Sequence, residues 1–314
     1  MPDAQLEIRP IKQDEWDLVA ELIHVSTNAW YQDHYGFDIF TGPTSNCLVF
    51  PEVYENLDPG CCIAAFDPGS GVLAGSCFYH PRETHVSLGI LNVHPDHFGK
   101  GIAGKLLDFV INFAKQRDQP LRLVSSALNL DSFALYNRRG FAVTGFYQDM
   151  LIEVPNQGFT IPLPDGMTVR DASPEDAAKM ADLELKLAGI RREKDFAHFI
   201  ENKAKIWGVS ILEKADGTLA GFLASVNHPG SRLLGPGVAE DEATAAALLA
   251  RELDVRHRGA KLVFLIPSSR PKLVAFAKDL GARICELHVS QTLSDEPQPP
   301  ATGIVFPTFM PETA

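Results

Sequence analysis

A glycine-rich segment with two lysines stands directly before an apolar helical pattern. It reads His94-Pro95-Asp96-His97-Phe98-Gly99-Lys100-Gly101-Ile102-Ala103-Gly104-Lys105-Leu106-Leu107. The residues from Thr84 to Val93 before it alternate as in a strand, and Leu106, Leu107 and Val110 continue one apolar face of a helix after it. A glycine loop at a helix N-terminus presents backbone N–H groups, and the helix dipole adds positive charge. The segment therefore predicts an anion site, for example for a phosphate.

Two classes of phosphate-bearing ligand compete for this loop. Gly99, Gly101 and Gly104 have the spacing of the GxGxxG dinucleotide motif, which would indicate a Rossmann oxidoreductase. That motif normally follows the first strand of its domain, and the next strand ends in an acidic residue that binds ribose. Here about four expected strands precede the loop, and the next strand, Leu121 to Ser126, has no carboxylate at its end. The dinucleotide interpretation is therefore a distant alternative.

A second interpretation accounts for more of the chain. Val93-x-Pro95 followed by Gly99-x-Gly101-Ile102-Ala103 resembles the acyl-CoA pyrophosphate loop of GCN5-related N-acetyltransferases (GNAT), and Asn129-x-x-Ser132-x-x-Leu135-Tyr136-x-x-x-Gly140-Phe141 resembles the later motif of that family. The two motifs occur in the family's order, and the resemblance spans residues 6 to about 148. Phe98 departs from it, because the family has Gln or Arg at that place.

The resemblance implies acetyl-CoA as the acyl-donor substrate and suggests a role for each matching residue. The strand Leu91-Asn92-Val93 would pair its backbone with the pantetheine amides. Asn129 would lie near the pantetheine arm, Ser132 would also bind the cofactor, and Tyr136 would reach the thioester sulfur and protonate the leaving thiolate. The pyrophosphate would be wrapped by the N–H groups of Phe98, Gly99, Lys100, Gly101, Ile102, Ala103 and Gly104.

The base and the acceptor site are less defined. His85, Ser87, Gly89 and Leu91 are expected on one face of the strand, and the family often has a carboxylate where this chain has Ser87. His85 is therefore the first candidate for the base and Glu83 the second. The aromatic and acidic run from Trp30 to Asp38 suits an amine pocket, but such runs also occur as plain helix-to-loop packing. The acceptor is expected to be a small-molecule or peptide amine.

An internal repeat predicts two similar domains. The strand Leu6 to Ile11 precedes a helical pattern that Asp14 can cap, and Met167 to Arg170 precedes a second such pattern. A hairpin with its turn at 67–71 is echoed by one with its turn near Gly217. We expect an acetyltransferase domain at 1–150, a linker at 151–166, a GNAT-like copy at 167–293 and a proline-rich tail at 294–314 that packs along the surface or stays mobile.

The second copy has different residues at the equivalent positions. Aligning Leu106-Leu107 with Leu248-Leu249 places Asp241 and Glu242 where the first copy has Gly99 and Lys100. Carboxylates repel a pyrophosphate. The repeat also places Ala277 opposite Tyr136. The second copy is therefore expected to be degenerate, retained for packing or for shaping the acceptor cleft.

Composition limits the remaining possibilities. The 314 residues carry a net charge of −12, which disfavours nucleic acid or an anionic membrane as the main partner. The N-terminal residues lack a signal-peptide pattern, and no apolar run reaches the roughly 20 residues of a membrane span, so a cytoplasmic protein is expected. Five cysteines without metal-ligand spacing predict no metal site.

The sequence thus predicts an α/β protein with two tandem GNAT-like domains, each a mixed, mainly antiparallel sheet flanked by helices. The expected activity is direct acetyl transfer from acetyl-CoA to an unidentified amine in the N-terminal domain. The alternative from another class is an acyl-CoA-binding regulatory module without turnover, and the oxidoreductase remains third. The oligomeric state is not predicted.

Overall fold

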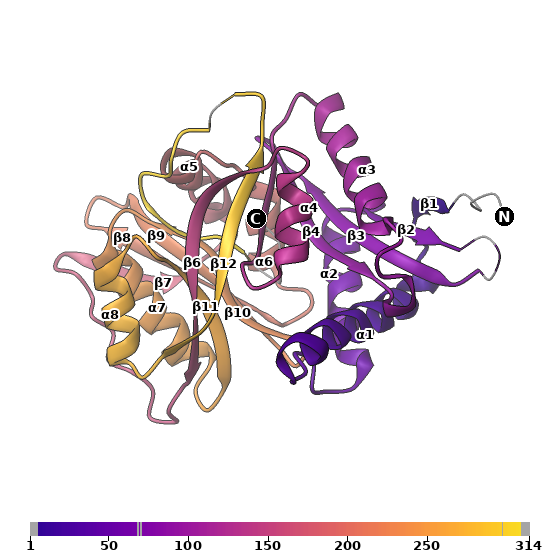
Figure 1. Ribbon diagram of the computed structural model, residues 1–314. Helices are drawn as coiled ribbons and strands as arrows, with labels where there is room; N and C mark the ends of the chain where they lie inside the picture. The colour runs from indigo at the N-terminus through magenta and orange to yellow at the C-terminus, as the bar shows by residue number, and fades with distance from the viewer. Residues whose placement is uncertain (1–5, 68, 70, 297, 309–314) are drawn as a thin grey trace. The chain divides into compact units, whose positions relative to one another are not determined.

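The computed structural model describes residues 6–67, 69, 71–296 and 298–308, and contacts divide the chain into two compact units. Unit 1 holds the chain up to Pro81, residues 86–121 and residues 228–230; unit 2 holds residues 82–85, 122–227 and the chain from Ser231 onward. Figure 1 labels the elements of both. The expected domain boundaries at 150, 166 and 293 remain predictions. No described helix is both long and apolar enough to cross a membrane.

Unit 1 is an antiparallel sheet with helices on both faces (Figure 1). Gly75 on β3 faces Ile102 and Leu106 of α3, whereas its neighbour Ser76 lies on the opposite face of the strand. Tyr54 of α2 contacts Phe78 on that second face. The elements are β1 (Glu7–Pro10), η1 (Gln13–Glu15), α1 (Trp16–Tyr35), η2 (Thr44–Leu48), α2 (Val49–Leu57), β2 (Cys62–Phe66), β3 (Leu73–Pro81), β4 (Val86–Val93), η3 (Pro95–His97) and α3 (Ile102–Gln116).

A bulge interrupts β4 and changes which of its side chains share a face. Leu88 pairs with Tyr79, but Leu91 pairs with Cys77, so β4 has one residue more than β3 across this step. Ser87 therefore lies on the face of His80 and Asn92, and Leu91 on the other. The expectation that His85, Ser87, Gly89 and Leu91 share one face was wrong, because simple alternation does not survive a bulge.

Unit 2 is a larger sheet in the order β5-β12-β6-β11-β10-β9-β8-β7. The strand β6 lies between β11 and β12 and pairs antiparallel with both, so the long strand after the second motif belongs to a sheet that is completed by the second copy. Its elements are β5 (Leu121–Ser126), α4 (Leu130–Asn137), β6 (Ala142–Glu153), β7 (Met167–Asp171), η4 (Pro174–Asp176), α5 (Ala177–Ala188), α6 (Glu193–Glu201), β8 (Trp207–Lys214), β9 (Leu219–His228), β10 (Ser231–Ala239), α7 (Glu242–Arg256), β11 (Lys261–Pro267), α8 (Pro271–Asp279), β12 (Arg283–Leu293) and β13 (Ile304–Phe306).

The C-terminal segment forms a strand, β13, in the core of unit 2. It pairs antiparallel with the end of β10, matching Gly237 with Phe306 and Ala239 with Ile304. Ile304 is 1% exposed and Phe306 is fully buried. The expectation of a surface or mobile tail was therefore wrong for this part, because two apolar side chains two residues apart enter the core while the backbone adds to a sheet edge. Residues 309–314 and Pro297 lie outside the described residues, as do Pro68 and Ser70 of the expected turn at 67–71.

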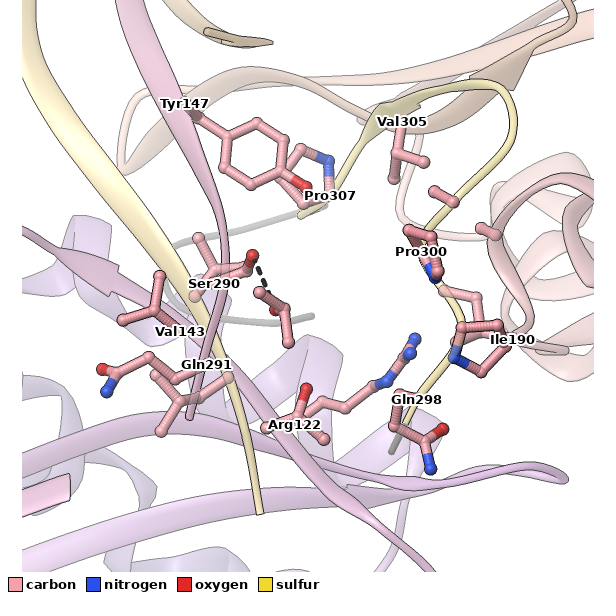
Figure 2. Close-up of a pocket in the computed structure, with 17 residues that line it drawn as sticks. Arg122, Val143, Tyr147, Ile190, Ser290, Gln291, Gln298, Pro300, Val305 and Pro307 are labelled. Carbon is pink, nitrogen blue, oxygen red and sulfur yellow. Dashed lines mark hydrogen bonds between the residues drawn. The ribbon is translucent and has the colours of Figure 1, made fainter. Parts of the chain in front are cut away.

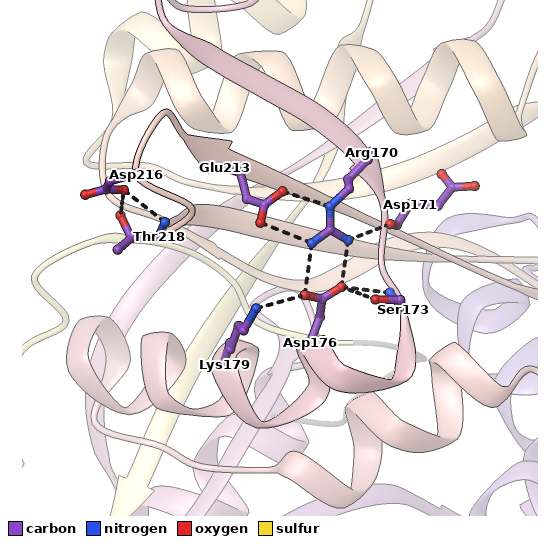
Figure 3. A network of polar contacts seen from close by, with 8 residues as sticks. All are labelled: Arg170, Asp171, Ser173, Asp176, Lys179, Glu213, Asp216 and Thr218. Atoms are coloured by element: carbon purple, nitrogen blue, oxygen red, sulfur yellow. Dashed lines mark hydrogen bonds and ion pairs between the residues drawn. The ribbon is translucent and has the colours of Figure 1, made fainter.

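Each copy of the repeat begins with the same arginine–carboxylate pair. Arg9 on β1 binds Glu15 through two hydrogen bonds of 2.8 and 2.6 Å, and Glu15 also accepts from the backbone N–H of Lys12. Arg170 on β7 binds Asp176, again six residues later, through bonds of 2.7 and 3.0 Å (Figure 3). The expectation that Asp14 caps the first helix was wrong, because Glu15, not Asp14, accepts the backbone N–H of Lys12 at the start of η1, and no described side chain caps α1.

In unit 2 the pair extends into a network. Glu213 accepts two further hydrogen bonds from Arg170, and Asp176 accepts from both the backbone N–H and the hydroxyl of Ser173 (Figure 3). The hydrogen bonds from Arg170 are the main cause of the lowered pKa of Asp176. In unit 1 the hydrogen bonds from Arg9 are the main cause that lowers the pKa of Glu15 to about 2.

This pairing predicts how stability responds to pH. The folded-state pKa of Asp176 lies below its unfolded value, so ionised Asp176 stabilises the fold above about pH 4, and this stabilisation is lost as pH falls through the folded pKa. We expect Asp176→Asn to lower the free energy of unfolding at pH 7 by about 1–3 kcal/mol, and to flatten the loss of stability below about pH 4. Chemical denaturation at several pH values measures both.

The exposed neighbour Glu175 provides the matched control for this substitution. Glu175→Gln removes one carboxylate from the same turn and is expected to change the free energy of unfolding by less than about 0.5 kcal/mol. Equal effects of the two substitutions would contradict the assigned role of Asp176.

Candidate functional site

The glycine loop of unit 1 leaves the N-terminus of α3 open. Gly99 and Gly101 adopt positive φ values of 74° and 76°, and a Cβ at either position would have no neighbour within 4 Å. Gly101 is the N-cap of α3, and no described side chain caps this helix. The first turn of an uncapped helix offers N–H groups that have no partner within the helix. A helix start of this kind can bind an anion through its backbone alone.

Some of the loop's donors are already used inside the loop. The N–H of Phe98 donates to Pro95 O at 3.1 Å, and that of Lys100 to His97 O at 3.4 Å. The ammonium of Lys100 folds back to Asp96 O at 2.8 Å, and the Phe98 side chain is 46% exposed. The donors that face a ligand are therefore expected to come mainly from Gly99 and from Gly101 to Gly104.

The packing of α3 depends on a glycine in the strand beside it. A Cβ at Gly75 would lie 2.9 Å from Ile102 Cγ2 and 3.2 Å from Leu106 Cδ1, so only glycine permits this approach of helix and strand. Ile102, Leu106, Leu107 and Val110 are at most 2% exposed. The apolar face of α3 therefore fixes where its N-terminus lies.

Asn92 connects the end of β4 to α1 within unit 1. Its amide donates to Ser26 Oγ at 2.6 Å and lies 3.4 Å from Thr27 Oγ1. This bond holds the segment from Leu91 to Val93, where the resemblance implies pantetheine pairing. The amide nitrogen of Asn92 is thus occupied within the fold, whereas its buried Oδ1 has no hydrogen-bond partner among the described residues.

The second motif forms the start of α4 in unit 2. Asn129 is the N-cap of α4, and its side-chain oxygen accepts the N–H of Ser132 at 3.0 Å. Tyr136 is 5% exposed, and its ring lies 5.7 Å from the ring of Phe141. The loop of unit 1 and these residues of unit 2 belong to different compact units.

The turn that places α4 is held by β12. Ser126 donates its hydroxyl to Glu286 and accepts the N–H of Leu128 at 3.1 Å. The N–H of Ala127 donates to Leu287 O at 2.8 Å. The position of Asn129 therefore depends on a strand more than 150 residues later in the chain.

Both candidates for the base belong to unit 2. His85 is fully buried, and its Nδ1 lies 3.1 Å from Thr84 Oγ1, which also accepts the N–H of Arg191. Glu83 is half exposed and accepts a hydrogen bond of 2.6 Å from Arg191 Nε. The two side chains thus differ in environment, one in the protein interior and one in an ion pair at the surface.

The structure reveals a buried histidine–carboxylate pair that the sequence did not indicate. His80 Nδ1 and Asp58 Oδ2 are 2.7 Å apart, and both residues are at most 4% exposed. The ring of Tyr54 lies 4.8 Å from that of His80. A carboxylate on Nδ1 fixes the imidazole tautomer that leaves Nε2 as the basic atom. No motif spacing joins Asp58 to His80, because the pair forms only when α2 packs on β3.

The aromatic run at the end of α1 forms a cluster in unit 1. Trp30 stacks on His34 with 4.3 Å between ring centroids, and Tyr31 lies 5.7 Å from Phe37. Tyr35 and Phe37 are 44% and 50% exposed. Stacked and partly exposed rings of this kind can bind a cation by their faces.

The second copy has the equivalent strand, but its edge is occupied. Gly221 has the same surroundings in the second copy as Gly75 has in the first. A Cβ at Gly75 would meet Asn92 O, Ile102 and Leu106, and a Cβ at Gly221 would meet the equivalent Val238 O, Thr244 and Leu248. The segment Gly237 to Ala239 therefore corresponds to Leu91 to Val93. Within unit 2 this segment pairs with β13, and β13 also lies against β11.

The helix after this strand is capped by the chain itself. Asp241 is the N-cap of α7, and its Oδ1 accepts the N–H of Thr244 at 2.8 Å. Thr244 corresponds to Ile102, which is the first residue of α3. Because α7 already begins at Glu242, it has two more residues at its start than α3 has. In the second copy these residues and the Asp241 carboxylate stand where the first copy has the last residues of its glycine loop.

Ala277 corresponds to Tyr136 in local hydrogen bonding as well as in sequence. The N–H of Phe141 donates to Tyr136 O at 3.3 Å, and that of Ala282 donates to Ala277 O at 3.0 Å. Gly140 and Gly281 follow with positive φ values of 89° and 96°. The second copy keeps this backbone but has a fully buried methyl group where the first has a phenol.

One cluster in unit 2 has ligand types that suit a cation. Asp149, Glu286 and His288 place one ligand atom each within 4.8 Å of one another. His288 Nδ1 and Asp149 Oδ1 form a hydrogen bond of 2.9 Å, and Ser126 donates to Glu286. These bonds account for the cluster as a structural one, so we assign no metal to it.

Comparison with known proteins identifies the family. The model of the acetyltransferase (GNAT) family matches residues 24–141, and that of an acetyltransferase (GNAT) domain matches residues 180–291. The chain is a tandem member of the GNAT family, a family of acyltransferases. A search of curated proteins found no match.

Solved structures share this fold over nearly the whole chain. An acetyltransferase candidate from Pyrococcus horikoshii is 16% identical, with 95% of this chain and 92% of that chain covered and a TM-score of 0.71. A GCN5-related N-acetyltransferase from Sphaerobacter thermophilus is 16% identical, with 96% and 99% covered and a TM-score of 0.65. A tandem GNAT protein from the clavulanic acid biosynthesis pathway is 16% identical, with 94% and 100% covered and a TM-score of 0.61.

Proposed function

We propose that this protein is an N-acetyltransferase that binds acetyl-CoA only in its N-terminal copy and transfers the acetyl group directly to an amine. The observation that carries the proposal is the contrast between two equivalent helix N-termini. That of α3 follows glycines and has no described side-chain cap, whereas that of α7 is capped by Asp241. The adjoining strand edge supports the same conclusion, because β13 already pairs with Gly237 to Ala239.

The proposed reaction uses an amine and three groups of the protein. The neutral amine attacks the thioester carbonyl, a backbone N–H of the β4 segment stabilises the oxyanion, a base takes the proton that the attacking nitrogen loses, and an acid protonates the thiolate that leaves. Tyr136 is the proposed acid. The loop and Tyr136 lie in different units, so their joint action on one acyl-CoA rests on the family resemblance. The aromatic cluster near Trp30 supports an acceptor that is cationic before it loses its proton.

Charge placed at the loop tests which copy binds acetyl-CoA. Gly101→Glu puts a carboxylate, and an L side chain at a positive φ, at the open N-terminus of α3. We expect it to abolish acetyl-CoA binding in calorimetry, whereas Ala243→Glu in the first turn of α7 leaves the affinity nearly unchanged. Loss of binding with Ala243→Glu alone would overturn the assignment. Thermal denaturation of both variants checks that they fold.

Tyr136→Phe tests the proposed acid, because it keeps the ring that contacts Phe141 and removes only the hydroxyl. We expect kcat to fall by about two orders of magnitude or more while acetyl-CoA affinity changes little. Release of free thiol from acetyl-CoA with a panel of amines measures turnover. Unchanged kcat would make Tyr136 a packing residue. Acetyl-CoA binding without turnover on any amine would instead favour a regulatory binding module.

The pH dependence of kcat/KM distinguishes candidates for the base. We propose His85 or Glu83, and the structure adds His80 as a third. Any of these bases must be deprotonated to act, so kcat/KM should rise with pH as the base loses its proton. We expect this rise to disappear in only one of His85→Ala, His80→Gln and Glu83→Gln. A rise that survives all three and moves with the pKa of the acceptor would show that the enzyme selects the neutral amine itself.

A further inference from the structure

A cavity of about 300 Å³ lies within unit 2, apart from the residues assigned above to acetyl transfer. Its walls come from β5, β6, β12, the end of α5 and the C-terminal segment (Figure 2). Most of the lining is apolar, with Val143, Ile190, Val305 and three prolines of the C-terminal segment. Such a cavity, with few polar groups, has the character of a small-molecule site.

Arg122 is the charged residue of this lining, and among the described residues that surround the cavity there is no Asp or Glu. Figure 2 shows its side chain reaching across the cavity toward Ile190 and Pro300. In the described part of the chain its buried Nε has no hydrogen-bond partner. Desolvation lowers the pKa of Arg122, but a guanidinium remains protonated at neutral pH.

The nearest charges do not neutralise Arg122. Glu184 raises the pKa of Arg122 and Arg192 lowers it, but these two residues already pair with each other, with Arg192 Nε 2.9 Å from Glu184 Oε1. Both are at most 1% exposed. A buried pair of opposite charges plus Arg122 leaves one positive charge in excess. Arg122 is only partly buried, so water can reach part of its charge, and an anion in the cavity would serve the buried Nε side of the guanidinium.

Hydroxyl groups lie on the strand side of the cavity. Thr144 donates to Ser290 Oγ at 3.0 Å (Figure 2), and Ser290 also forms a hydrogen bond with Tyr147. Burial raises the pKa of Tyr147, so its phenol is neutral. Neutral hydroxyls beside a guanidinium add hydrogen bonds to an anion without adding a competing negative charge.

We infer that this cavity binds a small carboxylic acid in its ionised form, with the carboxylate on Arg122 and an apolar body against Val143, Ile190 and Val305. One excess positive charge matches one negative charge, whereas a phosphate dianion would exceed it. The planar guanidinium can hold a carboxylate through two parallel hydrogen bonds. The site is independent of the proposed acetyl transfer.

Titration of the full chain with hexanoate and benzoate tests the site, with hexanamide, benzamide and inorganic phosphate as comparisons at equal ionic strength. We expect at least one carboxylate to raise the melting temperature and to bind measurably in calorimetry, and its amide and phosphate to bind at least tenfold more weakly. Equal binding of the carboxylate and its amide, tighter binding of phosphate, or no binding of either carboxylate would overturn the inference.

Substitutions assign the binding to this cavity. Arg122→Met keeps the apolar stem and removes the charge, so it should weaken carboxylate binding at least tenfold while leaving the unliganded melting temperature equal or higher. Val143→Phe, at a position 42% exposed, narrows the cavity and should also weaken binding. Arg283→Met, at an exposed arginine of the same unit, should not. If Val143→Phe and Arg122→Met each leave the affinity for the carboxylate unchanged, the assignment to this cavity is refuted. If Arg122→Met does not fold, unchanged affinity in Val143→Phe refutes it.

Discussion

In each copy, the strand that precedes the aligned helix, β4 or β10, must satisfy the backbone N–H and C=O groups along its edges, and this requirement shapes the rest of the protein. An unpaired strand edge can bind an extended ligand such as pantetheine, or it can be covered by another strand. In unit 2 the chain covers this edge itself, because Ile304 to Phe306 pair with Gly237 to Ala239. The buried side chains of Ile304 and Phe306 then become part of the core, so opening this edge would expose apolar surface as well as break hydrogen bonds.

The N-terminus of the helix that follows each strand also needs hydrogen-bond partners for its backbone. Four N–H groups at the start of a helix need partners from a side chain, water or a ligand. Asp241 supplies a carboxylate to α7, and this both satisfies an N–H and repels a phosphate. Gly101 supplies nothing to α3, so its donors remain available. We propose that this one exchange of side chains at equivalent helix starts separates an anion-binding site in the first copy from a structural role of the second.

Much of this arrangement could be predicted from the sequence, and what could not has physical reasons. The glycine loop, the repeat and the substitution of Ala277 for Tyr136 depend on local spacing, which a sequence displays. The bulge in β4 places Ser87 and Leu91 on opposite faces of the strand, although alternation predicted the same face. The sequence does not show where a strand contains an extra residue. The pairing of β13 joins segments about 65 residues apart and follows a proline-rich stretch that suggested a surface tail.

The remaining surprises are long-range contacts between polar residues. Asp58 and His80 come from a helix end and a strand, and nothing in their spacing indicates a pair. Arg122 was given no role from the sequence, yet it lines a cavity whose walls come from β5, β6, β12, the end of α5 and the C-terminal segment. Buried charge becomes recognisable only when all elements around it are known.

The number of acetyl-CoA molecules bound per chain tests the central claim most directly. Isothermal titration of the intact, unsubstituted protein with acetyl-CoA measures this number without any assumption about the acceptor or the base. The account predicts one molecule per chain, because in the second copy β13 covers the strand edge and Asp241 caps the helix start, whereas no described side chain caps α3. Two molecules per chain would show that β13 and Asp241 do not close the second copy, and would contradict the account.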